Sequence, residues 1–475
     1  MTHDCSFLED CPLADDQLSF SPEPRESHAT DYGTERNGGS GVLPDAVVWP
    51  ECTEDVSNVL AAATDAGVPV TPYAAGTGLE GNAVPAYGGI SLDLTRMDDV
   101  VDYRPDDFQI DVGPGIIGST VDEYVANDGL FFPPLPSSGN ISTVGGMIAT
   151  DASGMKTVRY GEIADWVLGL EAVLADGTII ETGSRAIKTS SGYNLTDLIV
   201  GSEGTLAVVT EATLALAGRP QQIRGGRAIF ETLDEAAEAV FDAVRTDVDV
   251  ARIELVDGLS ATMANDYLGS DLPDAPMVFL EFHANHGIET EIDLCRTIFA
   301  DHAVDRFEMS DDDAEMEALW QARRELAYAV SNYDPDLESL RPGDVTVPIS
   351  AYPDVVREVK RLADEADLLV PCFGHAGDGN LHYSVLVDPD DADELERGEH
   401  LYRSVVELAM EFGGTATGEH GIGDGKQKYL EPEHGAAAVE TMRVIKRALD
   451  PTDTLNPGKI FPETSEGGRI RGPEC

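Results

Sequence analysis

The stretch AAGTGLEGN at residues 74–82 decides how the first half of the chain is interpreted. It contains Gly-x-Gly-x-x-Gly, a pattern that in a Rossmann fold opens a helix whose N-terminus binds a pyrophosphate. Here Pro85 and the pair Gly88-Gly89 follow, and they prevent a helix. The stretch is therefore either a plain glycine turn or a loop whose backbone N–H groups bind phosphate without a helix.

Two further stretches rich in small residues, at 142–154 and 201–206, lie in the same half of the chain. Three such loops suit one long ligand that lies against the backbone, and a dinucleotide has that length. Because no helix is expected after Gly81, an NAD-dependent Rossmann dehydrogenase is disfavoured. The sequence thus favours a dinucleotide site of another construction.

Short strands and amphipathic helices surround these loops. Apolar spacing predicts a helix at 53–66, a capping box predicts another at 120–129, and Asp176-Gly177 predicts a hairpin. A domain boundary is expected at Gly218-Arg219-Pro220. Beyond it, helices alternate with strands, and the longest of these helices is expected at 312–331. The pattern is that of an α+β protein.

The second distinctive region is the stretch GHAGDGNLH at residues 374–382. Asp378-Gly379 predicts a two-residue hairpin turn, which would place His375 opposite His382 with Cβ atoms about 5 Å apart. Two such imidazoles can share a metal ion, although the spacing is also compatible with histidines that bind none. The stretch GEHGIGDGK at 418–426 adds a carboxylate beside an imidazole, and a His₂Glu set with open positions suits zinc, manganese or iron(II).

These motifs, in this order, resemble those of the family of FAD-linked D-lactate dehydrogenases (cytochrome) and glycolate oxidase subunits, over roughly residues 40 to 462. Arg159-Tyr160-Gly161, SGYNL at 191–195 and GSEGTL at 201–206 are the most specific matches. The resemblance implies an α+β fold with a two-part FAD-binding domain of the vanillyl-alcohol-oxidase type, an α+β substrate (cap) domain and a C-terminal helical return. The expected parts are a polar N-terminal lead-in at 1–40, the FAD-binding domain at 41–218, the substrate domain with the metal site at 219–425, and the returning helical segment at 426–475.

The resemblance implies FAD as the cofactor. Some relatives attach FAD through a histidine in the first loop, and this chain has none there, so non-covalent FAD is expected. The residues that match FAD-binding positions are Ala75, Gly76, Thr77, Gly78, Leu79, Gly139, Thr143, Gly145, Gly146, Ala149, Ser153, Gly154, Glu203, Gly204, Val209 and Asn456.

The resemblance also assigns the reaction: oxidation of a D-2-hydroxy acid, with D-lactate favoured, to the 2-oxo acid by hydride transfer to FAD. His375, His382 and Glu419 match the ligands of a divalent metal, zinc or manganese. His420 matches the base that takes the substrate proton, and Arg323 matches the arginine that binds the substrate carboxylate.

Other functions stay open. Glycolate and D-2-hydroxyglutarate are alternative substrates; relatives that act on the latter carry lysine and asparagine where this chain has Pro342 and Ser384, which favours a small monocarboxylic acid. A non-catalytic FAD-binding subunit of a larger complex is disfavoured because the matched histidines and glutamate are intact. No Cys-x-x-Cys pair occurs, so electrons must pass to an external acceptor: a quinone, a cytochrome, an electron-transfer protein or an iron–sulfur partner subunit.

The chain is very acidic, with 88 Asp and Glu against 31 Lys and Arg and a formal net charge of −57. Such a charge repels nucleic acids and anionic membranes, and no apolar run reaches the roughly 18 residues of a transmembrane helix. The N-terminus lacks the pattern of a secretory signal, and the six cysteines form no disulfide framework. We expect a cytoplasmic protein, or one peripheral to the membrane through its acceptor partner.

Because the acidity is spread along the whole chain, a halophilic protein from a high-salt cytoplasm is expected. At about 1 M salt the Debye length falls to roughly 3 Å, which screens the repulsion among the carboxylates. The melting temperature should therefore rise from dilute buffer to molar salt. A scan of melting temperature against salt concentration tests this, and a flat curve would contradict it.

Overall fold

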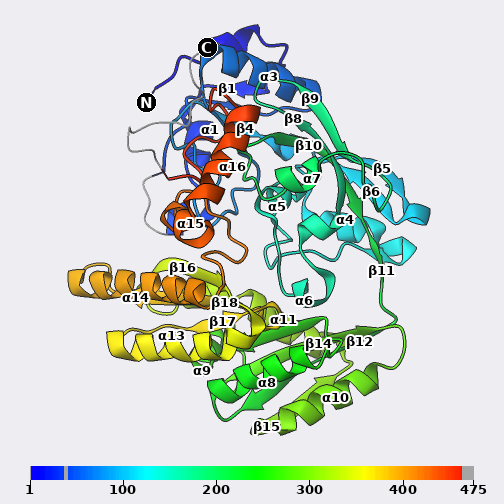
Figure 1. The fold of residues 1–475 in the computed structure, drawn as a ribbon, viewed down its shortest axis with the longest axis vertical. Helices are drawn as coiled ribbons and strands as arrows, with labels where there is room; N and C mark the ends of the chain where they lie inside the picture. The colour runs from blue at the N-terminus through cyan, green and yellow to red at the C-terminus, as the bar shows by residue number, and fades with distance from the viewer. Residues whose placement is uncertain (1, 37–40, 463–475) are drawn as a thin grey trace. The chain divides into compact units, whose positions relative to one another are not determined.

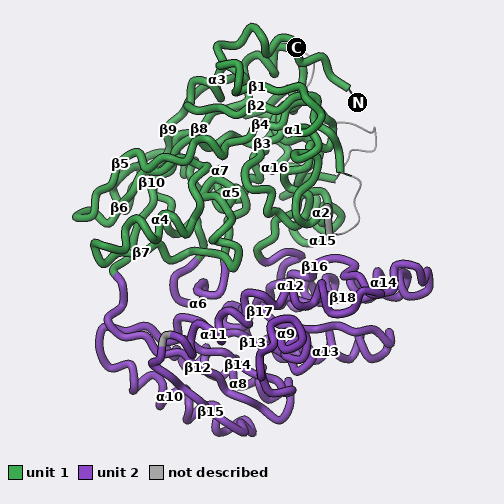
Figure 2. The backbone as a smooth tube through the Cα atoms, turned by 180° about the vertical axis from the view of Figure 1, so that it is seen from behind, with its two compact units in different colours: residues 1–153, 162–218, 419–475 green, residues 154–161, 219–418 purple. Residues whose placement is uncertain are grey.

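The computed structural model describes residues 2–36 and 41–462, which form two compact units (Figures 1 and 2). The first unit combines the N-terminal residues up to Ser153 with residues 162–218 and the C-terminal part from Glu419. The second unit combines residues 154–161 with 219–418. The first unit is therefore assembled from three separate stretches of the chain.

One sheet of the first unit has four strands in the order β1-β2-β4-β3. Its strands are β1 (Leu18–Ser19), β2 (Ala46–Val48), β3 (Val70–Tyr73) and β4 (Ile90–Asp93). β2, β4 and β3 are parallel, and α3 (Thr53–Ala66) connects β2 to β3 as a βαβ unit requires. Ahead of β2 lie η1 (Ser6–Asp10), α1 (Pro22–Ser27) and α2 (Tyr32–Arg36). The N-terminal residues, expected to be a polar lead-in, thus add β1 to the sheet and Leu8 to its core.

The other large sheet of the first unit is antiparallel, in the order β5-β6-β10-β8-β9. Its strands are β5 (Val100–Arg104), β6 (Gln109–Val112), β8 (Val167–Val173), β9 (Ile179–Gly183) and β10 (Val208–Ala215). The helices of this region are α4 (Gly118–Val125), α5 (Val144–Thr150) and α7 (Leu195–Ile199), and β7 (Leu130–Phe131) pairs with β11 (Ala217–Gly218). Apolar side chains of α4 and α5 share one core with β6, β8 and β10, which fixes α5 beside the start of β10.

The second unit is built on one antiparallel sheet of seven strands, in the order β15-β12-β14-β13-β17-β18-β16. The strands are β12 (Gln222–Phe230), β13 (Arg252–Val256), β14 (Met277–Ala284), β15 (Val304–Ser310), β16 (Glu338–Thr346), β17 (Cys372–Gly374) and β18 (Asn380–Val387). The helices are α6 (Thr157–Tyr160), α8 (Leu233–Arg245), α9 (Gly258–Leu268), α10 (Ile288–Ala300), α11 (Asp313–Arg324), α12 (Leu326–Ser331), α13 (Tyr352–Ala366) and α14 (Ala392–Glu411). α8 packs against α10 and α13, and α13 packs against α14 (Figure 1).

Elements with strong local signals form as the sequence predicts. The helix at 53–66 ends at Gly67 in the left-handed conformation, and Gly177 forms the turn between β8 and β9. Two details differ. α4 begins at Gly118 without a side-chain cap, so Thr120 opens no capping box. The helix expected at 312–331 is two helices, because regular helical geometry is interrupted at Glu325 between α11 and α12.

Within residues 2–36 and 41–462, no helix has both the length and the apolar character that crossing a bilayer requires.

A buried lysine anchors the C-terminal segment, which contains α15 (Gln427–His434) and α16 (Ala436–Leu449). Lys446 on α16 is 2% exposed. Its Nζ donates to Asp450 Oδ2 at 2.5 Å and to the carbonyl oxygens of Thr205 and Leu455, both at 2.8 Å. The ammonium is thus paired and fully bonded, which a buried charge requires.

Lys446→Met is expected to lower the free energy of unfolding by about 3–5 kcal/mol, because it leaves the buried Asp450 carboxylate without its cation. Arg447→Met is the matched control: Arg447 lies on the same helix but pairs with Glu440 near the surface, and its loss should cost less than about 1 kcal/mol. Urea unfolding at constant molar salt measures both variants. Equal losses would contradict the role assigned to Lys446.

Candidate active site

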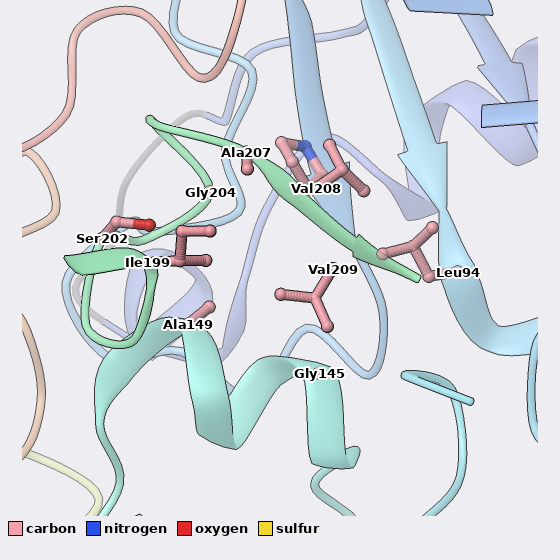
Figure 3. Close-up of a pocket in the computed structure, with 10 residues that line it drawn as sticks. Leu94, Gly145, Ala149, Ile199, Ser202, Gly204, Ala207, Val208 and Val209 are labelled. Atoms are coloured by element: carbon pink, nitrogen blue, oxygen red, sulfur yellow. The ribbon is translucent and has the colours of Figure 1, made fainter. Parts of the chain in front are cut away.

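A small pocket lies in the first unit beside α5 and the first residues of β10 (Figure 3). It is lined by Pro72, Leu94, Gly145, Ala149, Ile199, Ser202, Gly204, Ala207, Val208 and Val209. Gly145, Ala149, Gly204 and Val209 are among the predicted FAD-binding residues. The other lining residues were not predicted, although Ser202 and Ala207 lie in or directly after the stretch 201–206, whose small residues indicate the region.

Small residues keep the approach to α5 open, which suits a flat or extended ligand. A Cβ atom added at Gly146 would meet only Thr143 Oγ1, at 3.2 Å, whereas one at Gly145 would come within 2.6 Å of Pro114 Cβ. Gly145 is therefore required for packing, and Gly146 presents bare backbone. These residues fit a dinucleotide that lies against main chain.

The glycine loop at 74–82 is held by the N-terminal segment. Tyr32 N donates to Gly76 O at 2.8 Å, and Gly33 N donates to Gly78 O at 2.9 Å. Gly76 has a φ of 63°, so a side chain there would be strained. The structure has turns and no helix at 79–89, so a Rossmann arrangement of this loop is ruled out.

Glu203 connects the glycine loop to the C-terminal part of the first unit. Its carboxylate accepts hydrogen bonds from Asn82 Nδ2 at 2.6 Å and from the backbone N–H groups of Ile422 and Gly423 at 2.7 and 2.9 Å. Burial raises the pKa of Glu203, and these hydrogen bonds oppose that rise. Asn456 Nδ2 donates to the carbonyl oxygens of Asn82 and Glu203, at 3.0 and 2.8 Å.

All predicted FAD-binding residues belong to the first unit except Gly154, which belongs to the second. Ser153, the last residue of its stretch in the first unit, donates from Oγ to Glu419 Oε2 at 3.1 Å. Glu162, which was not predicted, lies in the same unit. Burial, together with the nearby carboxylates of Asp151, Asp165 and Glu419, raises the pKa of Glu162 to about 7.

In the second unit, His375 and His382 lie next to each other, as predicted, but by a different route. Their ring centroids are 5.1 Å apart and the rings are nearly perpendicular. The predicted register is wrong: Phe373, not His375, pairs with His382. The reason is that residues Ala376–Asp378 form a 3-10 turn, which lengthens the connection between β17 and β18.

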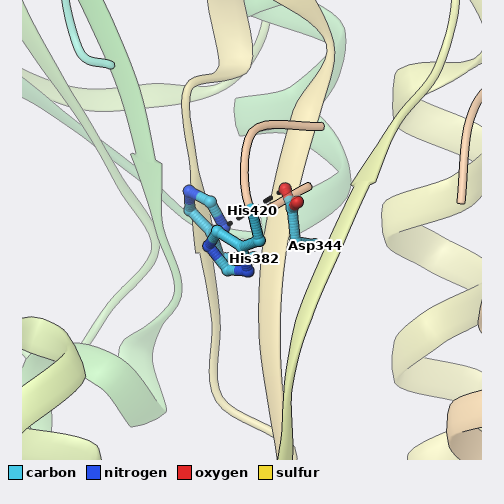
Figure 4. Close-up of side chains that lie close together, drawn as sticks. All are labelled: Asp344, His382 and His420. Atoms are coloured by element: carbon cyan, nitrogen blue, oxygen red, sulfur yellow. Dashed lines mark ion pairs between the residues drawn. The ribbon is translucent and has the colours of Figure 1, made fainter. Parts of the chain in front are cut away.

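Asp344 on β16 stands opposite His382 in the register of β16 and β18 (Figure 4). Its Oδ1 is 3.8 Å from His382 Nδ1 and accepts a hydrogen bond from Asn380 Nδ2 at 2.8 Å. Its Oδ2 accepts from Thr417 Oγ1 at 3.0 Å and from Gly418 N at 2.8 Å. Asp344 therefore fixes the end of the second unit immediately before Glu419 and His420 in the chain.

Glu254 on β13 is completely buried and contacts two of the predicted site residues, His375 and Arg323. His375 Nδ1 lies 2.9 and 3.0 Å from its two carboxylate oxygens, and Arg323 Nε donates to its Oε2 at 2.7 Å. Arg323 is 3% exposed, and its Nη2 has no hydrogen-bond partner among the described residues. A buried guanidinium nitrogen without a hydrogen bond costs free energy, and an anionic ligand would supply the missing acceptor.

The donors of the second unit fit a divalent cation. A ring nitrogen of His375 lies within 4.8 Å of one of His382, and Asp344 offers a carboxylate oxygen to His382 over a similar distance. Because the Nδ1 atom of His375 faces Glu254, Nε2 is the ring nitrogen that would bind a metal ion. Imidazole and carboxylate donors suit zinc or manganese.

The two units have the fold of vanillyl-alcohol-oxidase-type flavoenzymes. Solved structures of similar fold include p-cresol methylhydroxylase with substrate bound, at a TM-score of 0.76 with 17% identity over 94% of each chain. Another is 4-ethylphenol oxidase from Gulosibacter chungangensis, at a TM-score of 0.72 with 19% identity over 96% of each chain. At these identities the likeness concerns the fold alone, and it confirms the predicted α+β fold class.

Residues 44–183 match the family described as FAD binding domain, and residues 219–460 match FAD linked oxidases, C-terminal domain. The chain therefore belongs to the FAD-linked oxidases and is an FAD-dependent oxidoreductase, as the sequence predicted. It is 37% identical to probable mitochondrial D-lactate dehydrogenase of Danio rerio, over 94% of this chain and 89% of that relative. Glycolate oxidase subunit GlcD of Bacillus subtilis is 36% identical, over 88% and 89%. Mitochondrial D-lactate dehydrogenase [cytochrome] of Arabidopsis thaliana is 37% identical, over 88% and 74%.

The pocket beside α5 can be tested directly through Ala149. Ala149→Leu should reduce FAD affinity about tenfold or more, because overpacking costs about 1–3 kcal/mol and the pocket has little room to relax. Ala437→Leu, on the exposed surface of α16, is the control and should bind FAD as the wild type does. Titration of apoprotein with FAD, followed by flavin fluorescence, measures both affinities. Wild-type affinity in Ala149→Leu would show that FAD lies elsewhere.

Proposed function

We propose that this enzyme oxidises a small D-2-hydroxy acid, with D-lactate favoured, to the 2-oxo acid with the help of a divalent metal. The observation that carries the proposal is Arg323, whose buried Nη2 atom has no hydrogen-bond partner among the described residues. A carboxylate is the natural partner of such a group. Through Glu254, Arg323 is joined to His375, so the carboxylate would be bound beside imidazole donors.

The FAD would be held non-covalently by three runs of backbone and small side chains in the first unit and by neighbouring residues. The proposed contacts are those named from the resemblance, with the glycine loop at 74–82 on the pyrophosphate and Ala149, Gly204 and Val209 in the pocket beside α5. Asn456 and Glu203 would act by fixing the loop at Asn82. Bound FAD supplies the acceptor for the hydride that leaves C2 of the substrate.

His375, His382 and Glu419 are proposed as the metal ligands. Glu419 directly follows Gly418 in the chain. Gly418 N donates to Asp344, which stands opposite His382, and this supports the inclusion of Glu419 in the set. Ser153 orients the Glu419 carboxylate through its hydrogen bond to Oε2. The metal, zinc or manganese, supplies Lewis acidity that lowers the pKa of the substrate hydroxyl.

His420 is proposed as the base. An imidazole nitrogen of His420 takes the hydroxyl proton while Arg323 holds the carboxylate, so that C2–H has a fixed direction. The backbone of His420 is held by the first unit, where its carbonyl oxygen accepts from Asn82 Nδ2 at 3.4 Å.

Two positions favour a small monocarboxylic acid over 2-hydroxyglutarate. Pro342 and Ser384 stand opposite each other in the register of β16 and β18, two pairs along from Asp344 and His382 and therefore on the same face. A lysine and an asparagine at this pair would offer a second carboxylate a cation and an amide, and Pro342 and Ser384 offer neither.

The electrons are proposed to leave through an external acceptor, and a cytochrome is the first candidate because relatives such as the Arabidopsis enzyme carry that word in their names. A quinone, an electron-transfer protein or an iron–sulfur partner subunit are the other candidates. The setting that we propose is a high-salt cytoplasm, supported by the net charge of −57.

Anaerobic mixing with D-lactate in molar salt should bleach the visible flavin absorbance, whereas L-lactate should not. Faster bleaching by glycolate would make glycolate the substrate, and bleaching only by D-2-hydroxyglutarate would overturn the argument from Pro342 and Ser384.

His420→Ala should retain FAD and metal, yet its flavin should be reduced about 10²- to 10⁴-fold more slowly, since a general base contributes that much to the rate. Wild-type reduction in this variant would refute its role as base.

A further inference from the structure

We propose that Glu254 is a positioning residue that serves the metal ligand and the substrate-binding arginine at the same time. The inference rests on the proposed function, because it takes His375 as a ligand and Arg323 as the carboxylate-binding group. Nothing in the sequence motifs indicates Glu254. Its role is visible only from the contacts that the fold brings together in the second unit.

The two partners of Glu254, Arg323 and His375, come from different elements of the second unit. It lies on β13 opposite Phe279 of β14, whose ring packs edge-on against Trp320 of α11. The face of the sheet that carries Glu254 is therefore the face that α11 covers, and α11 also carries Arg323. His375 comes from the connection between β17 and β18.

The contact with His375 selects the ligand atom. The buried carboxylate of Glu254, whose oxygens lie 2.9 and 3.0 Å from His375 Nδ1, accepts a hydrogen bond from the N–H at that nitrogen. Since a neutral imidazole carries one N–H, its lone pair then lies on Nε2. Carboxylate partners of this kind fix the tautomer and ring orientation of metal-binding histidines and raise their basicity.

The contact with Arg323 selects the edge of the guanidinium that meets the substrate. Glu254 Oε2 accepts a hydrogen bond from Arg323 Nε at 2.7 Å, and the guanidinium carbon lies 5.0 Å from the centre of the Phe373 ring. The group is thus fixed from two sides, with its buried Nη2 atom unpartnered among the described residues. A carboxylate that binds there meets an arginine that cannot rotate, so little entropy is lost on binding.

One carboxylate with two donors cannot be replaced by an amide without loss. In Glu254→Gln, the single amide oxygen can accept from His375 or from Arg323, and the amide NH₂ group faces the other donor. The variant keeps the size and shape of the side chain. Its effect should therefore appear in metal binding, in substrate binding or in both, and not only in stability.

Glu281→Gln is the matched control. Glu281 lies on the neighbouring strand and the same face, and it is buried like Glu254. It likewise faces an arginine and a histidine, with Arg252 Nε at 3.2 Å and His283 Nε2 at 2.8 Å. Its partners differ from those of Glu254, which pairs with His375 and Arg323. Any general cost of removing a buried charge from this sheet is therefore shared by both variants.

The test measures two quantities in the FAD-loaded protein in molar salt: zinc affinity by competition with a chromophoric chelator, and KM and kcat for D-lactate at saturating zinc. Glu254→Gln should bind zinc about 10- to 100-fold more weakly, the usual cost of losing such a partner, and should raise KM more than it lowers kcat. Glu281→Gln should match the wild type in both. The flavin spectrum and the melting temperature show whether each variant is folded.

Glu254→Asp provides a second test if Glu254→Gln does not fold. It keeps the charge, but being one methylene shorter it cannot reach both donors, so either zinc affinity or KM should worsen by about tenfold. Wild-type values of both quantities in a folded Glu254 variant would overturn the inference. Equal losses in Glu281→Gln would overturn it too. Wild-type protein that binds no zinc would instead refute the proposed metal site, and the inference about Glu254 would fall with it.

Discussion

The first unit depends on the buried carboxylate of Glu203. This group accepts hydrogen bonds from the glycine loop through Asn82 and from the C-terminal stretch through Ile422 and Gly423. Asn456 adds a fourth stretch by donating to the backbone of Asn82 and Glu203. A buried carboxylate that lost these donors would carry a large desolvation cost, so the segments are stable only together.

This constraint explains why the chain leaves the first unit and returns to it. The second unit takes up the whole sequence between Gly218 and Glu419, and the stretch after it supplies two of the donors to Glu203 as well as Lys446. The FAD-binding part is therefore complete only when residues more than two hundred positions apart have met. The residues from Glu419 onward, which carry the proposed ligand and base, are part of that closure.

Local signals in the sequence predicted the structure correctly wherever a segment's conformation depends on its own residues. The apolar spacing of α3, the Asp176-Gly177 turn and the missing helix after Gly81 all have causes within a few residues. The histidine pair was found, yet its register was not, because Ala376–Asp378 form a 3-10 turn that the Asp-Gly signal does not distinguish from a tight hairpin. Glu254 could not be found at all: a single glutamate in an apolar strand gains meaning only from Arg323 and His375, which lie 69 and 121 positions away.

The pairing of Glu254 with Arg323 has a consequence for how an anion enters so acidic a protein. The pair is neutral in sum, so Arg323 offers a substrate carboxylate directed hydrogen bonds and little net attraction. A divalent cation at the proposed site would supply the net attraction, which matters because the chain as a whole carries a formal net charge of −57. At about 1 M salt, repulsion from that surface is screened within roughly 3 Å, whereas interactions inside a buried site are screened far less. High salt would thus weaken the repulsion between the acidic surface and the substrate, and it would largely preserve the attraction inside the buried site.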